Sequence, residues 1–174
     1  MNLRAGFCPL RARQTGVVPW LALAALVGIL DQLTKMIASS YLIYGIPRAV
    51  MPGFNWTLLH NTGAAFSLLN DAAGWQRWLF SSIAVVVAGV VVWRLVKMDR
   101  SDRWEAGALA FILGGAIGNL IDRLRLGYVV DFIQVYFRQH SFPAFNIADS
   151  AIVVGAFMIV FASKLNSPRS PSND

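Results

Sequence analysis

The chain has 174 residues, of which 56% are hydrophobic and only 14% are charged. Soluble domains carry about 25% charged residues, so this composition excludes an ordinary soluble domain and favours a membrane protein. The formal net charge of +6 would suit a nucleic-acid partner, but the basic residues stand beside apolar runs rather than in a stripe, and we expect no nucleic acid. The single cysteine, Cys8, excludes an intramolecular disulfide and a cysteine-based metal site.

Residues 17–39 form the first apolar run and predict a membrane-spanning helix, because about 20 apolar residues cross a bilayer. Residues 1–16 before it are basic and contain no apolar run, and we interpret them as a cytoplasmic tail. A cleaved signal peptide is the alternative, since residues 38–40 resemble a cleavage site. Three further apolar runs follow, which favours a retained first helix.

Residues 41–74 make up the longest segment between apolar runs, and we expect it to be extracytoplasmic. Proline and glycine residues interrupt it, which argues against one continuous helix. From Phe54 to His60 the residue types alternate, as is typical of a short strand. We therefore predict a small β-sheet on the membrane surface.

Three more apolar runs predict spans over residues 75–96, 104–124 and 145–165, and residues 166–174 form a polar tail. Nine of the fifteen Lys and Arg residues fall at the two ends of the chain and in the loop between the second and third spans. The positive-inside rule therefore places both termini in the cytoplasm. The predicted fold is an all-α polytopic membrane protein: one membrane domain of four transmembrane helices with a small extracytoplasmic sheet.

This topology gathers the polar residues of the apolar runs at the extracytoplasmic ends of three spans. Ionisable groups inside a membrane cost a few kcal/mol each on insertion scales, which makes them functional candidates. The residues, in chain order, are Asp31, Lys35, Asn119, Asp122, Arg123, Asn146 and Asp149, with Asp131 in the predicted loop between the third and fourth spans. The sequence therefore predicts a site at this membrane face.

Of the kinds of catalytic site that hydrolases use inside membranes, these residues suit a pair of carboxylates. The two histidines, His60 and His140, lie in separate segments and form no HExxH zinc motif, and no G-x-S-x-G elbow is present. An aspartate pair that shares one proton activates water against an amide bond, and Asp131 and Asp149 are the candidates. We expect no metal and no cofactor.

Structural interpretations of the same residues remain open. Asp131 is also suited to capping a helix or turn, and Asp149 to bonding backbone at the first turn of a helix. Arg123 is suited to pairing with a nearby aspartate or reaching the headgroups. Gly114 and Gly118 form a GxxxG pair, which predicts close helix packing rather than a nucleotide loop.

Two other functions compete with a hydrolase. A small transporter would use the same carboxylates to couple protons or cations, although no repeat relates the first two spans to the last two. A packing subunit would use the aspartates only to hold its fold together.

Five short motifs resemble the lipoprotein signal peptidase family, also called signal peptidase II. They occur in the order of that family and extend from the first span to the fourth. They are DQLTK (31–35), HNTGAAFS (60–67), GGAIGNLIDR (114–123), VVDF (129–132) and FNIADS (145–150).

The resemblance implies an aspartic endopeptidase of the bacterial inner membrane. Its substrates would be diacylglyceryl-modified prolipoproteins, cut just before the lipidated cysteine, and the peptide antibiotic globomycin would occupy its substrate site. It also implies a surface helix beside the sheet, and we expect a monomer surrounded by membrane phospholipid.

The resemblance also assigns residue roles. The family's catalytic aspartates fall on Asp131 and Asp149. The remaining motif positions would contact substrate or support the site, and they are Asp31, Lys35, Asn61, Gly63, Asn119, Asp122, Arg123 and Asn146. Gly63 is in addition a candidate hinge for the segment 41–74.

Overall fold

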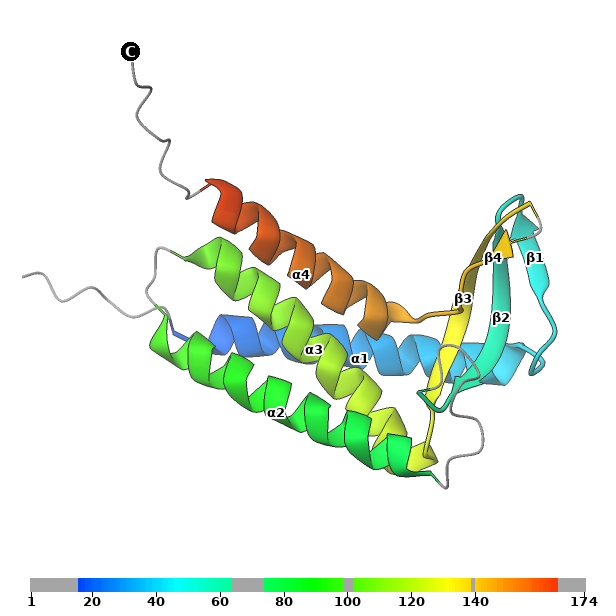
Figure 1. The fold of residues 1–174 in the computed structure, drawn as a ribbon, viewed down its shortest axis with the longest axis horizontal. Coiled ribbons are helices and arrows are strands. Elements are labelled where there is room, and N and C mark those ends of the chain that lie inside the picture. Colours follow the sequence, from blue (N-terminus) through cyan, green and yellow to red (C-terminus); the bar gives the residue numbers. More distant parts are fainter. Residues whose placement is uncertain (1–15, 64–73, 99–101, 139, 166–174) are drawn as a thin grey trace, which may run out of the picture.

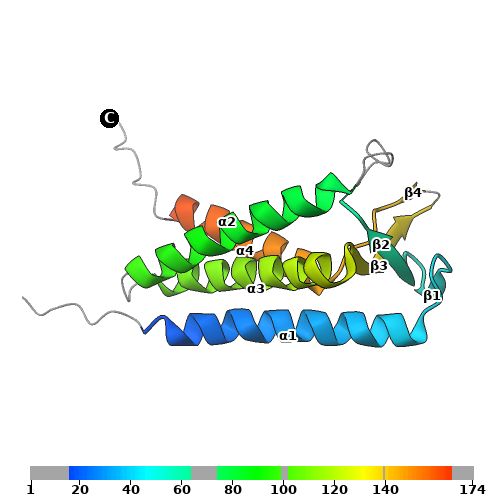
Figure 2. The ribbon, with the colours of Figure 1, turned by 90° about the horizontal axis from the view of Figure 1, so that it is seen from below.

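A bundle of helices carries a small sheet at one end, which we call the sheet end (Figure 1). The computed structural model describes residues 16–63, 74–98, 102–138 and 140–165. The helices run side by side along the long axis, and the described part of the chain begins and ends at the end of the bundle opposite the sheet (Figures 1 and 2). The predicted tails therefore lie mostly outside the described residues.

The four predicted spans are all helical. Their bounds are α1 (Val18–Tyr41), α2 (Trp75–Lys97), α3 (Arg103–Leu126) and α4 (Ile147–Leu165). Each of α1, α2 and α3 is long and apolar enough to cross a membrane, whereas the apolar part of α4 within the described residues, Ile147–Phe161, is shorter. The helix ends differ from the predicted ones by at most two residues.

Helix α3 is the centre of the bundle, and α1, α2 and α4 all pack against it (Figure 2). Glycines make this packing close. A Cβ on Gly114 would lie 2.6 Å from the carbonyl oxygen of Ala24 in α1, and one on Gly115 would collide with the carbonyl oxygen of Ala148 in α4. A Cβ on Gly118 would lie 2.6 Å from Oδ2 of the Asp31 side chain, so the close packing predicted from the GxxxG pair is confirmed.

Four strands of the described chain form one antiparallel sheet in the order β1-β2-β3-β4. Their bounds are β1 (Arg48–Met51), β2 (Phe54–Asn61), β3 (Val129–Phe137) and β4 (His140–Ser141). The strand predicted from Phe54 to His60 is confirmed as β2.

The prediction that Asp131 lies in a loop is wrong, because this residue belongs to β3 and faces Leu59 of β2 in the register. The run Val129–Phe137 is rich in β-branched and aromatic residues, which fit a pleated and half-buried surface. The pairing of β3 with β2 fixes the backbone of Asp131 relative to the sheet. The described residues of segment 41–74 beyond Tyr41 contain no helix, and residues 64–73 of this segment lie outside the described residues.

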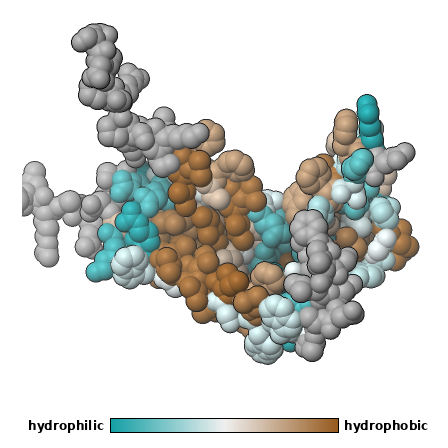
Figure 3. Space-filling view, viewed as in Figure 1, coloured by the Kyte–Doolittle hydropathy of each residue, from teal (hydrophilic) through white to brown (hydrophobic). Residues whose placement is uncertain are grey.

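The surface of the bundle is apolar along the helices (Figure 3). Hydrophilic residues border it at the end opposite the sheet, and others lie in a hollow between the helices and the sheet. An apolar belt between two polar zones is the surface that a bilayer requires of a protein inside it.

Candidate active site

The ten predicted site residues come from five elements that meet at the sheet end of the bundle. Asp31 and Lys35 lie on α1; Asn61 ends β2, with Gly63 two residues later; Asn119, Asp122 and Arg123 lie on α3; Asp131 lies on β3; Asn146 precedes α4 and Asp149 lies in its first turn. Hydrogen bonds and ion pairs join all of them except Arg123 into one network, in which the backbone N–H of Gly63 donates to Oδ1 of Asn61 at 2.8 Å, and Arg123 lies beside it.

Asn146 connects the two candidate catalytic carboxyls. It is fully buried, and its Nδ2 donates to Oδ1 of Asp131 at 2.7 Å. Its Oδ1 accepts the backbone N–H of Asp149 at 2.9 Å, and its own backbone N–H donates to Oδ2 of Asp149 at 3.3 Å. This reciprocal pattern is a capping box at the start of α4. The same residue therefore starts the helix and ties both aspartates to one amide.

Asp149 accepts hydrogen bonds on both carboxylate oxygens. Oδ1 accepts from Nδ2 of Asn119 at 2.8 Å, and Oδ2 accepts the Asn146 backbone N–H. The residue also lies in the first turn of α4, where the helix dipole favours negative charge. These contacts stabilise the ionised form. The backbone hydrogen bond that the structural interpretation of Asp149 expects is present, although the residue is half-buried rather than buried.

Asp131 has the opposite environment. Only 2% of it is exposed, and besides Asn146 its carboxyl bonds the side chain of Asn61. Burial, followed by the neighbouring charge of Asp149, raises the pKa of Asp131 from 3.8 to about 7. The Asp131 carboxyl is thus suited to hold a proton near neutral pH.

Lys35 organises the side of the network that faces α1. It is 3% exposed, and its ammonium lies 2.8 Å from Asp31, 2.9 Å from Asp122 and 3.0 Å from Oδ1 of Asn119. These three acceptors match the three donors of an ammonium group. Because the contact with Asn119 fixes the amide oxygen on the lysine side, Nδ2 of Asn119 is left to face Asp149.

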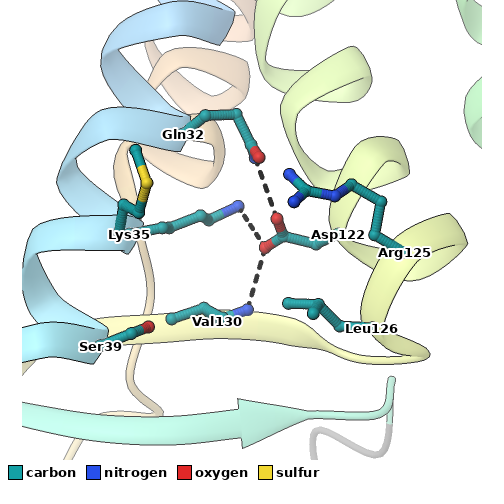
Figure 4. Close-up of a pocket in the computed structure, with 8 residues that line it drawn as sticks. Gln32, Lys35, Ser39, Asp122, Arg125, Leu126 and Val130 are labelled. Atoms are coloured by element: carbon teal, nitrogen blue, oxygen red, sulfur yellow. Dashed lines mark hydrogen bonds and ion pairs between the residues drawn. The ribbon is translucent and has the colours of Figure 1, made fainter.

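Each of the two carboxylates beside Lys35 also holds a backbone group of another element. Oδ1 of Asp31 accepts the N–H of Ala148 in the first turn of α4 at 2.9 Å. Oδ2 of Asp122 accepts the N–H of Val130 in β3 at 3.0 Å (Figure 4). Asp31 therefore fixes the start of α4, and Asp122 fixes the strand that carries Asp131.

Arg123 and Gly63 meet on the side of the site that faces α2. The Arg123 guanidinium lies 5.2 Å from the centroid of the Phe80 ring and interacts electrostatically with Asp149 and Asp131. Gly63 has a φ of +100°, and a Cβ on it would collide with the same Phe80 ring. Among the described residues Arg123 forms no ion pair within 4.0 Å, so its positive charge acts on Asp131 and Asp149 without direct contact.

Sequence reasoning missed two contributors. Gln32 donates to Oδ1 of Asp122 at 2.9 Å (Figure 4). It also donates to the carbonyl oxygen of Gly118 at 3.1 Å. It stands between Asp31 and Lys35 inside an apolar run, and a polar amide at that position was the available signal. Phe80 carries no such signal, because a phenylalanine in an apolar helix is indistinguishable from a lipid-facing residue.

The arrangement suits acid–base chemistry on water. The part of the chain that the structure describes has no group of three His, Cys, Asp or Glu residues placed to hold a metal ion. A buried carboxyl of raised pKa beside a second carboxyl that accepts several hydrogen bonds is an arrangement that suits a proton-sharing aspartate pair.

Comparisons with known proteins show which family the chain belongs to. A family model described as signal peptidase (SPase) II matches residues 23–165. The lipoprotein signal peptidase of Acinetobacter baumannii is 53% identical over 154 residues, with 88% of each chain covered. That of Pseudomonas putida is 54% identical over 158 residues, covering 88% of this chain and 92% of its own. The chain belongs to the signal peptidase II family.

The fold of this signal peptidase II family member also matches solved structures. A bacterial membrane enzyme determined by the in meso method superimposes with a TM-score of 0.78 at 29% identity, covering 94% of this chain and 98% of the other. A second one gives the same TM-score at 30% identity, covering 90% and 99%. The chain is therefore a membrane-embedded peptidase of the lipoprotein signal peptidase family, and the family match contains all ten predicted site residues.

Proposed function

We propose that the protein is an intramembrane aspartic endopeptidase that cuts diacylglyceryl-modified prolipoproteins just before the lipidated cysteine, with Asp131 and Asp149 as its catalytic pair. The observation that carries this proposal is that Asn146 bonds both carboxyls, Asp131 through its side-chain amide and Asp149 through its backbone N–H, while burial raises the pKa of Asp131 to about 7. No metal or cofactor is needed for this chemistry.

In the proposed reaction, the ionised Asp149 takes a proton from a water molecule whose oxygen attacks the scissile carbonyl carbon. Protonated Asp131 donates its proton to the carbonyl oxygen, and a gem-diol forms. The C–N bond then breaks as Asp149 gives its proton to the leaving amine and Asp131 regains one from the gem-diol. Arg123 lowers the cost of the negative charge that moves between the two carboxyls.

The position of the pair suits a lipidated substrate. A diacylglyceryl cysteine keeps its acyl chains among the lipid tails, so that the scissile bond lies near the headgroups. The pair lies where α3, α4 and the sheet meet, at one end of the apolar belt. We propose that all four helices span the bacterial inner membrane, with the sheet extracytoplasmic and both termini cytoplasmic, and that the enzyme works as a monomer. Globomycin, a peptide antibiotic, would block cleavage by occupying the same site.

Cleavage by purified protein in liposomes tests the proposal. The wild type should release the signal peptide from a diacylglyceryl-modified prolipoprotein without an ion gradient, and the unmodified precursor should remain intact. Asp131→Asn and Asp149→Asn should each lower the rate about a thousand-fold or more, because each removes a group that moves a proton.

Glu105→Gln is the matched control, since it makes the same chemical change at an exposed ion pair with Arg94, far from the pair. It should keep the wild-type rate. Full activity in either aspartate variant would refute the proposed pair, and ion flux without hydrolysis would favour the transporter instead.

A further inference from the structure

An open groove runs along α3 between α1 and α2. Both helices pack against α3 but make few contacts with each other, and the space between them measures about 490 Å³. Its walls are apolar along almost the whole length. The residues that form most of it are Leu21, Ala25 and Ile29 of α1 and Leu113, Ile117 and Ile121 of α3.

A polar pocket of about 200 Å³ continues this groove at the sheet end. Gln32 lines both spaces, so the pocket is the sheet-end mouth of the groove. The side chains around it include Lys35, Asp122 and Arg125 (Figure 4). The walls therefore change from apolar to polar at the same level on α1 and on α3.

The pocket has one positive charge that the network does not use. Lys35 is committed to Asp31 at 2.8 Å and to Asp122 at 2.9 Å, and Asp122 also accepts hydrogen bonds from Gln32 and Val130. Arg125 is exposed in the last turn of α3, and among the described residues it forms no ion pair. Figure 4 shows its side chain beside the pocket, near Asp122. An arginine in this position is suited to a phosphate group, which it binds with two parallel hydrogen bonds.

The length of the groove and pocket fits one lipid molecule. The residues that line them on α1 run from Leu21 to Ser39. At about 1.5 Å per residue this stretch covers roughly 27 Å. One leaflet of a bilayer occupies about 21 Å with its headgroup, so a complete phospholipid fits along the stretch.

We propose that the groove and pocket together bind one membrane phospholipid, with an acyl chain between α1 and α2 and the phosphate on Arg125. The occupant is a phospholipid rather than the diacylglyceryl group of a substrate, because diacylglyceryl carries no phosphate for Arg125 to bind. The site is separate from the proposed catalytic pair: the groove follows the face of α3 that carries Ile117 and Ile121, whereas Asn119 on another face contacts Asp149.

Lipid retention by the full-length protein in detergent, measured by native mass spectrometry, tests the proposal. Phosphatidylglycerol is the phosphate-bearing probe, and diacylglycerol with the same acyl chains is the probe without phosphate. We expect one tightly held phosphatidylglycerol and much weaker retention of diacylglycerol. Arg125→Gln should weaken phosphatidylglycerol binding about ten-fold, as loss of a charge-assisted contact does, and leave diacylglycerol binding unchanged.

Ala25→Phe tests the apolar part, because Ala25 is exposed in the groove and a phenyl ring there would fill it. It should weaken binding of both lipids. Arg138→Gln, in the turn after β3, and Ala156→Phe, on α4, make the same changes at exposed positions. Both variants should bind the two lipids as the wild type does. Equal retention of the two lipids, or unchanged phosphatidylglycerol binding in Arg125→Gln, would overturn the proposal, whatever the cleavage assay gives.

Discussion

At the scale of single residues, the aspartates Asp131 and Asp149 have the same side chain but different hydrogen-bond partners and different burial. Asp149 meets hydrogen-bond donors on both oxygens at a helix start, and Asp131 is buried on a strand beside that negative charge. Asn146 fixes the position of Asp131 relative to Asp149. Its amide oxygen accepts the Asp149 N–H, and its amide nitrogen is thereby directed at the Asp131 carboxyl. The amide thus has one orientation that satisfies both contacts.

This asymmetry predicts how stability depends on pH. The Asp131 carboxyl titrates near 3.8 in the unfolded chain and near 7 in the folded protein. The protonated Asp131 carboxyl therefore stabilises the folded state. This contribution is complete below about pH 4 and is lost as the pH rises towards 7. The loss is on the order of 4 kcal/mol. Asp131→Asn does not titrate and should lose none of it.

Thermal unfolding in detergent at pH 5 and pH 8 measures the effect. The wild type should unfold at a clearly lower temperature at pH 8, and Asp131→Asn should show a smaller decrease and be the more stable of the two at pH 8. Glu105→Gln, at its exposed ion pair, should follow the wild type at both values. Parallel pH profiles for the wild type and Asp131→Asn would show that Asp131 is already ionised at low pH.

At the scale of elements, buried charge and small residues hold the helices together. Lys35 of α1 contacts Asp122 and Asn119 of α3, and its partner Asp31 holds α4 through Ala148. These bonds tie three helices at the level of the proposed catalytic pair. They could not be assigned from the sequence, because partners 84 or more residues apart become neighbours only after the helices pack.

Lys35→Met should be strongly destabilising, because it leaves the buried Asp31 and Asp122 carboxylates without their cation. Breaking a buried ion pair on one side costs about 3–5 kcal/mol. The double variant Asp31→Asn/Lys35→Met leaves one carboxylate uncompensated instead of two and should recover part of the loss. Lys97→Met, at an exposed position on α2, is the control and should be neutral. A single variant as stable as the wild type would contradict the role of Lys35.

Glycine contacts give a second prediction at this scale. A Cβ on Gly155 of α4 would lie 2.5 Å from the carbonyl oxygen of Ala108 in α3, whereas one on Gly89 of α2 would meet nothing within 4 Å. Gly155→Ala should therefore destabilise the protein by about 1–3 kcal/mol through overpacking. Gly89→Ala should stabilise it by about 0.5–1 kcal/mol through helix propensity. Chemical or thermal unfolding of the two variants compares them directly, and equal shifts would refute the packing argument.

At the scale of the whole molecule, much of the architecture follows from the sequence. Apolar runs longer than a bilayer is thick predict the helices to within two residues, since every backbone group in lipid must bond within its own segment. Strand β3 was not predicted, although its β-branched and aromatic residues were a visible signal, because its place between two spans suggested a loop. The site residues were recognisable as polar groups in apolar surroundings, but their contacts depend on how α1, α3 and α4 cross, which single-helix patterns do not encode.

The orientation of the molecule in the membrane is the prediction at this scale. Among the described residues, Arg94 and Lys97 in the last turn of α2 and Arg103 at the start of α3 lie at the end of the bundle opposite the sheet, and the positive-inside rule then places the sheet outside the cytoplasm. With Cys8 replaced by Ser, His140→Cys on β4 and Lys97→Cys at the end of α2 provide one thiol each on opposite ends of the bundle. In spheroplasts, a membrane-impermeant thiol reagent should label His140→Cys at once and Lys97→Cys only after permeabilisation. The reverse pattern would place the proposed catalytic pair on the cytoplasmic side, where a prolipoprotein with its acyl chains in the outer leaflet could not present its scissile bond to Asp131 and Asp149.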